Sequence, residues 1–98
     1  MSEILSKTAR KSVLGPLLEN GWKMAEGRDA LTKTFRFKNF VDALGWMTSA
    51  AIWAEKINHH PEWKNVYNLV EVTLISHDLG GVTERDVQLA QKLDSLRK

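Results

Sequence analysis

The chain has 98 residues, of which 43% are hydrophobic and 27% are charged, and its formal net charge at pH 7 is +2. This length and composition predict one ordinary globular domain over residues 1–98, with no segment composed like a disordered tail. The small net charge, with acidic residues lying among the basic ones, argues against a purely electrostatic function such as nucleic-acid binding.

Cysteine is absent from the sequence, which excludes a disulfide framework and thiolate catalysis. No stretch approaches the roughly 20 apolar residues that a membrane span needs. The first residues also lack the hydrophobic run of a signal peptide. We therefore expect a cytoplasmic protein that makes no membrane contact and is small enough to enter the nucleus as well.

The first part of the chain predicts a helix followed by a β-hairpin. Ser6 is a good helix cap, and the apolar residues after it recur at helical spacing until Gly21. Residues 22–26 and 30–37 alternate as strands do, and the turn-forming trio Gly27-Arg28-Asp29 joins them. In the second of these strands one face is predicted to be buried and the other to face water.

The central segment predicts a long helix over residues 40–58, which Asn39 caps and Pro61 stops. Its apolar residues form two stripes, and one sheet cannot cover both. We therefore predict self-association through this helix; the alternative is that the first or the last helix covers the second stripe. The first stripe comprises Phe40, Leu44, Met47, Ala51 and Ala54, and the second comprises Ala43, Trp46, Ala50, Trp53 and Ile57.

The rest of the chain predicts a second hairpin and a last helix. Residues 63–67 and 70–75 alternate as strands, with Asn68-Leu69 at the turn. The run Thr83-Glu84-Arg85-Asp86 resembles a capping box, with aspartate in the usual Glu/Gln position, and begins a helix that continues to about Leu96. The order α-β-β-α-β-β-α predicts an α+β fold: a four-stranded antiparallel sheet with three helices on one face.

The histidines of the chain are predicted to meet at one corner of this fold. His59 and His60 follow the central helix, and His77 follows the last strand. A short hairpin brings its outer ends together, so His77 should lie near the other two rings, with Asp86 close enough to accept a hydrogen bond from one of them. Imidazoles suit proton transfer near neutral pH. The alternative is that histidines at a helix end are surface caps.

A three-histidine zinc site is the competing interpretation, since catalytic zinc often takes three protein ligands. The adjacent pair does not match the i,i+4 or i,i+2 spacing that aims two rings at one ion, so we predict no metal and no cofactor. Trp22 and Trp63 could form the walls of a site for a flat ligand or belong to the core. Glu55 could anchor a ligand or be a solvated helix residue.

The run His59-His60-Pro61-Glu62-Trp63 makes the chain resemble the pterin-4a-carbinolamine dehydratases, also known as dimerisation cofactors of a homeodomain transcription factor. The resemblance covers nearly the whole length. Its other motifs, in family order and at family spacing, are Gly21-Trp22, Gly27-Arg28-Asp29-Ala30, Phe35-Arg36-Phe37-Lys38, Ala54-Glu55-Lys56, Asn65-Val66-Tyr67-Asn68, Ser76-His77 and Glu84-Arg85-Asp86.

The resemblance implies dehydration of 4a-hydroxytetrahydrobiopterin to quinonoid dihydrobiopterin and water, the step that recycles tetrahydrobiopterin after aromatic amino-acid hydroxylation. The catalytic residues would be His59, His60 and His77, with His59 or His60 as the acid toward the hydroxyl group and His77 moving the second proton. The residues that would bind or support the pterin are Glu55, Asn58, Trp63, Trp22 and Asp86, and Asp86 would orient His77.

The family resemblance also implies partners. Members form dimers by sheet pairing and tetramers through the long central helix, and in some animal members the same helix stabilises a homeodomain transcription factor dimer. A coactivator is therefore the alternative function. Nucleic-acid binding through Arg36 and Lys33 on the sheet is disfavoured, since Lys33 is predicted on the buried face. One departure is Asn58, which stands where many members have aspartate and lacks its charge.

Overall fold

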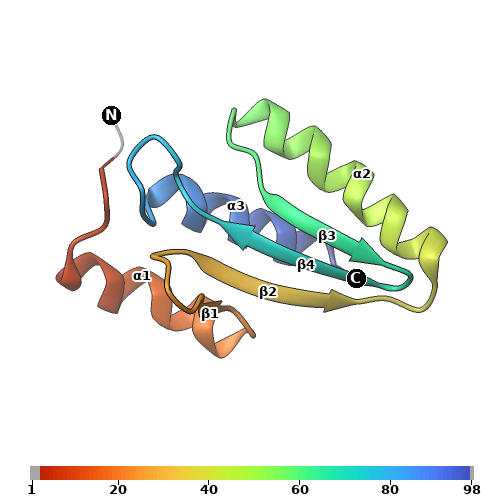
Figure 1. Cartoon of the computed structure of the whole chain (residues 1–98), viewed down its shortest axis with the longest axis horizontal. Helices are drawn as coiled ribbons and strands as arrows, with labels where there is room; N and C mark the ends of the chain where they lie inside the picture. The colour runs from red at the N-terminus through yellow and green to blue at the C-terminus, as the bar shows by residue number, and fades with distance from the viewer. Residues whose placement is uncertain (1–2, 98) are drawn as a thin grey trace.

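The computed structural model describes residues 3–97 and confirms the predicted order of elements and the α+β class. Residues 3–97 form three helices and four strands, and Figure 1 shows how these are arranged. The elements are α1 (Lys7–Glu19), β1 (Lys23–Met24), β2 (Leu31–Arg36), α2 (Phe40–Lys56), β3 (Glu62–Val66), β4 (Leu69–Leu74) and α3 (Glu84–Leu96).

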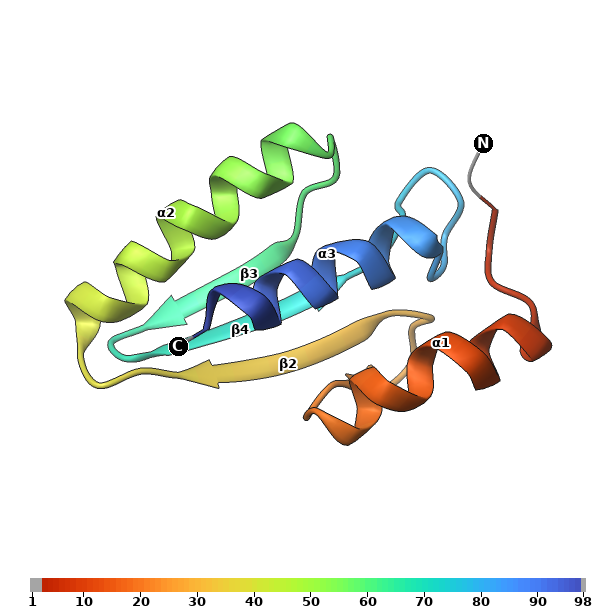
Figure 2. The same cartoon turned by 180° about the vertical axis from the view of Figure 1, so that it is seen from behind.

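The strands form one antiparallel sheet in the order β1-β2-β4-β3, so β4 lies inside the sheet and β3 forms one edge. The helices lie on one face of the sheet, with α3 between α1 and α2 (Figure 1, Figure 2). The second turn is Tyr67-Asn68, one residue earlier than predicted, because Leu69 already pairs with Val66. The Asn65 amide donates to the carbonyls of Tyr67 and Leu69 and holds this turn.

Local signals set most of the helix ends. Ser6 and Asn39 cap α1 and α2 as predicted, and each side chain accepts a bond from a backbone N–H three residues later. The predicted capping box of Thr83 and Asp86 opens α3. The β1 strand is shorter than predicted, because the N–H of Trp22 donates to the Leu17 carbonyl and so belongs to the end of α1.

Helix α3 covers the second apolar stripe of α2 and so forms the centre of the core. Trp46 is buried, and its indole N–H donates to the Leu93 carbonyl over 3.3 Å. The Lys92 ammonium lies 3.9 Å from the centroid of Trp53. The alternative interpretation of this stripe is thus the correct one. The first stripe is different: Phe40 and Leu44 are 46% and 49% exposed, and self-association through them stays a prediction.

Lys33 is a charged residue on the buried face of β2, and its charge is compensated at the edge of the core. Its ammonium donates to Asp94 over 2.7 Å and to the Asn20 carbonyl over 2.6 Å. The Trp22 indole donates to the same Asp94 over 3.0 Å. A buried charge is tolerated when it is paired in this way, so Lys33 is unavailable for the open face of the sheet.

No helix within residues 3–97 combines the length and the apolar character that crossing a membrane would require.

The central place of α3 in the core gives a stability test. Leu93 is fully buried, so Leu93→Ala should lower the free energy of unfolding by about 2–5 kcal/mol through lost contacts and a residual cavity. Gln91 is exposed on the same helix, and Gln91→Ala should change stability by only about 0.5 kcal/mol. Urea denaturation followed by circular dichroism at one fixed protein concentration measures both. Equal effects of the two substitutions would contradict this description of the core.

Candidate active site

All three histidines line one open pocket of about 260 Å³. The pocket lies where the chain leaves α2 and where the segment after β4 turns toward α3. Its lining residues are Asn58, His59, His60, Pro61, His77 and Asp78. A larger hollow of about 650 Å³ lies between α2 and the end of α3, but no histidine lines it. The three histidines therefore lie at one corner of the fold, as predicted.

A sharp bend after α2 lets two adjacent histidines line the same pocket. The N–H groups of Asn58 and His59 donate to the carbonyls of Glu55 and Ala54, which closes the helix, and Asn58 takes φ +53°. Asparagine tolerates this left-handed conformation better than most residues. Helix α2 thus ends at Lys56, two residues before the predicted end. The bend turns His59 inward, to 7% exposure, and leaves His60 exposed.

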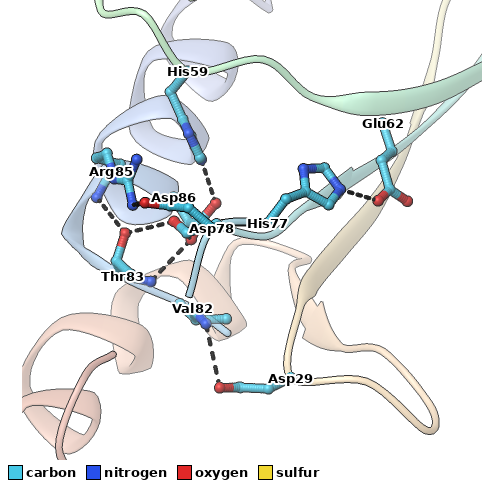
Figure 3. A network of polar contacts seen from close by, with 10 residues as sticks. Asp29, His59, Glu62, His77, Asp78, Val82, Thr83, Arg85 and Asp86 are labelled. Atoms are coloured by element: carbon cyan, nitrogen blue, oxygen red, sulfur yellow. Dashed lines mark hydrogen bonds and ion pairs between the residues drawn. The ribbon is translucent and has the colours of Figure 1, made fainter. Parts of the chain in front are cut away.

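His59 is held by the buried carboxyl group of Asp86. Its Nε2 lies 2.6 Å from Asp86 Oδ1 (Figure 3). The other oxygen, Oδ2, accepts bonds from the Ser76 hydroxyl and the Thr83 backbone N–H, both over 2.9 Å. A buried carboxyl group needs such partners. The prediction that Asp86 orients His77 is wrong, because Asp86 bonds His59 while His77 bonds Glu62.

The other two histidines pair with glutamates at the surface. His60 Nε2 lies 2.6 Å from Glu55 Oε1 on the last turn of α2. His77 Nε2 lies 2.6 Å from Glu62 Oε2 at the start of β3 (Figure 3). The sequence reasoning did not single out Glu62. The second hairpin contained the signal: Glu62 begins β3, and His77 follows the neighbouring strand β4.

Glu62 also binds Arg28, which lies in the turn between β1 and β2. Arg28 donates to its two oxygens over 2.9 Å and 2.7 Å. Arg28 and, to a lesser extent, His77 hold the pKa of the Glu62 carboxyl at about 2, below its ordinary value of 4.5. Glu62 is therefore a charged acceptor throughout the neutral range. Asp78, which lines the pocket, is a carboxylate that sequence reasoning missed; the bond from Arg85 lowers its pKa.

The three imidazole–carboxylate pairs use the same ring nitrogen. Nε2 contacts the carboxylate in His59, His60 and His77, and no residue in the described range bonds Nδ1 of these rings. A carboxylate accepts hydrogen bonds, so it favours a hydrogen on Nε2. Nδ1 is then the ring nitrogen that carries no hydrogen while the ring is neutral.

The predicted tryptophans do not line this pocket. Trp22 is buried and bonds Asp94, while half-buried Trp63 packs against Trp46 with ring centroids 6.4 Å apart. Asn58, in contrast, lies in the pocket wall, and Glu55 reaches it through His60. In the part of the chain that the structure describes, no group of three or more His, Asp or Glu side chains is arranged to hold a metal ion.

Comparison with known proteins gives a consistent result over almost the whole chain. A family model described as pterin 4 alpha carbinolamine dehydratase matches residues 3–96. Proteins of Ruegeria pomeroyi and Roseobacter denitrificans, both provisionally named pterin-4-alpha-carbinolamine dehydratase, are 59% and 60% identical over 96 residues. These alignments cover 98% of this chain and 99% and 98% of the two relatives.

Solved structures share the fold as well. The crystal structure of a transcriptional coactivator/pterin dehydratase from Brucella melitensis has a TM-score of 0.91 and 43% identity, and covers 98% of this chain and 100% of that one. A pterin dehydratase-like RuBisCO assembly factor of the α-carboxysome, 23% identical with a TM-score of 0.67, shares the fold over 79% of this chain and 89% of its own. The chain belongs to the pterin-4-alpha-carbinolamine dehydratase family.

Proposed function

We propose that the protein dehydrates 4a-hydroxytetrahydrobiopterin to quinonoid dihydrobiopterin and water, in the recycling of tetrahydrobiopterin. The observation that carries this proposal is a single pocket with three histidines, each with a carboxylate on Nε2, in a chain of a dehydratase family. No cofactor is needed, because the reaction changes no oxidation state and moves only protons and a hydroxyl group.

The chemistry requires one acid and one base on the same substrate. The C4a–O bond breaks as a proton reaches the departing hydroxyl, which leaves as water, and N5 loses its proton as the N5–C4a double bond forms. Neither step needs a covalent intermediate, and positioned imidazoles carry out both kinds of transfer. A flat pterin above the pocket could meet the free Nδ1 atoms of the rings.

The three rings differ in exposure, which supports a division of roles. His59 is held rigidly by buried Asp86, while His60 and His77 have side chains 56% and 63% exposed. We assign the protonation of the hydroxyl to His59 or His60, and the second proton to His77. Glu55 and Asp86 hold His60 and His59, and Asn58 contributes to the pocket wall that the substrate contacts.

Removing any one ring should reduce turnover by about 10²–10⁴-fold, the usual contribution of a positioned acid or base. The variants are His60→Ala, His77→Ala and His59→Gln; glutamine at 59 keeps a donor for buried Asp86 and so protects the fold. The measurement is the rate of quinonoid dihydrobiopterin formation from freshly generated carbinolamine, with the rate without protein subtracted. Lys23→Ala, on the open face of the sheet, is the control. Wild-type turnover in all three histidine variants would contradict the proposal.

Metal removal tests the same proposal independently. Because the pocket histidines bond carboxylates and transfer protons themselves, a metal chelator should leave turnover unchanged. The measurement repeats the rate after dialysis against chelator, with and without added zinc. Activity that disappears on chelation and returns with zinc would contradict direct acid–base catalysis.

We further propose self-association through the outer face of α2 and the edge of the sheet. Phe40, Val41, Leu44 and Ile52 are exposed on that helix, and contiguous apolar surface of this kind usually marks an interface. Strand β3 is an edge that a second copy could extend. The Brucella relative is called a transcriptional coactivator as well as a dehydratase, so a protein partner such as a homeodomain transcription factor is the alternative occupant of this face.

Charged substitutions separate assembly from folding. Leu44→Glu and Ile52→Glu should lower the mass measured by size-exclusion chromatography with light scattering, because they place a charge in the interface on α2 and leave only pairing at the sheet edge. Ser12→Glu, exposed on α1, should leave the mass unchanged. Trp46 is unsuitable for this test, because it is buried within the chain and a charge there would disrupt folding. A wild-type mass equal to one chain would contradict self-association.

A further inference from the structure

His77 is an exposed side chain whose position depends on a single partner. Its side chain is 63% exposed, and in the described part of the chain its side-chain hydrogen bond is the one to Glu62. An exposed histidine without a fixed partner would sample several rotamers and both neutral tautomers. The orientation of the ring therefore depends on what holds Glu62.

Arg28 holds Glu62 in a geometry in which one carboxylate oxygen also contacts the histidine. Its guanidinium contacts both oxygens, and Oε2 is shared between Arg28 Nη2 and His77 Nε2. A two-point arginine–carboxylate contact fixes the plane of the carboxylate, which a lysine cannot do. Arg28 comes from the turn between β1 and β2, so it links the first hairpin to the start of β3.

The charge of Glu62 determines where the ring proton lies. With a pKa of about 2 instead of 4.5, caused first by Arg28 and then by His77, Glu62 stays ionised at any pH above about 4. The folded pKa is the lower one, so the interaction stabilises the fold above pH 4.5 and is lost as the pH falls toward 2. An ionised carboxylate only accepts hydrogen bonds, so the hydrogen between the two groups belongs to Nε2.

We propose that Arg28 and Glu62 form a positioning pair that holds His77 in its Nε2–H tautomer, with Nδ1 bare and able to accept a proton from the substrate. The inference rests on the proposed function, because it gives His77 the role of base. It also assigns a role to Arg28, which the sequence indicates only as a turn residue.

The neighbouring residue of the same turn anchors the other end of the His77 segment. Asp29 accepts two bonds from Arg10 over 2.7 Å and one from the Val82 backbone N–H over 3.2 Å. Gly81 passes so close that a Cβ there would lie 2.5 Å from Asp29 Oδ2. Residues 77–82 are thus held at one end through Arg28 and Glu62 and at the other through Asp29.

The test reads the tautomer of His77 directly. Nitrogen-15 NMR of the two ring nitrogens, at a pH where the ring is neutral, should show Nε2–H as the dominant form in the wild type. Glu62→Gln replaces the acceptor by an amide that donates or accepts, so the two tautomers should mix. Arg28→Met should mix them to a smaller extent, and Arg28→Lys should lie between Arg28→Met and the wild type.

Kinetics then decide whether the tautomer matters for the reaction. In Glu62→Gln kcat should fall, but by less than the roughly 10²–10⁴-fold that loss of the whole base costs, with KM nearly unchanged, since proton transfer and not binding is affected. Lys64 is an exposed lysine on β3, the strand that Glu62 begins. Lys64→Met is therefore the matched control for the loss of a positive charge in Arg28→Met.

Wild-type tautomer populations in Glu62→Gln or in Arg28→Met would overturn the positioning pair, and so would altered populations with unchanged kcat. A wild-type protein without turnover would instead overturn the proposed function, while the tautomer populations would still report on the Arg28–Glu62–His77 contact. The two failures are therefore distinguishable.

Discussion

The buried carboxyl group of Asp86 is the contact on which the rest of the structure depends. It joins three chain segments: His59 after α2, Ser76 after β4 and Thr83 at the start of α3. A fully buried carboxyl group is costly unless its oxygens accept hydrogen bonds, so each partner is required for the stability of this corner. The same group caps a helix and orients a pocket histidine, so one carboxyl group serves both the fold and the pocket.

The pocket histidines differ in how they are held. His59 is fixed from inside the core, whereas His60 and His77 are fixed from the surface by Glu55 and Glu62. Surface ion pairs are weak individually, so a histidine ring at the surface keeps one orientation only if its partner is itself restrained. The two-point contact from Arg28 supplies that restraint for Glu62, and no comparable contact from an arginine reaches Glu55 in the described residues.

Helix α2 has two apolar sides with separate consequences. The side that carries Trp46 packs against α3 and completes the core of one chain. The side that carries Leu44 and Ile52 remains exposed in the single chain. Since the pocket begins where this helix ends, a partner bound along the outer side would meet the same element that positions His59 and His60.

The sequence by itself determined the order of elements, the caps at Ser6, Asn39 and Thr83, and the gathering of the histidines at one corner. These features follow from local periodicity, capping side chains and hairpin connectivity, which act over a few residues. Only the tertiary structure decided that Asp86 meets His59, that Glu62 meets His77 and that Trp22 belongs to the core. Such pairings join residues far apart in the chain and depend on the depth and direction of each side chain, which packing alone sets.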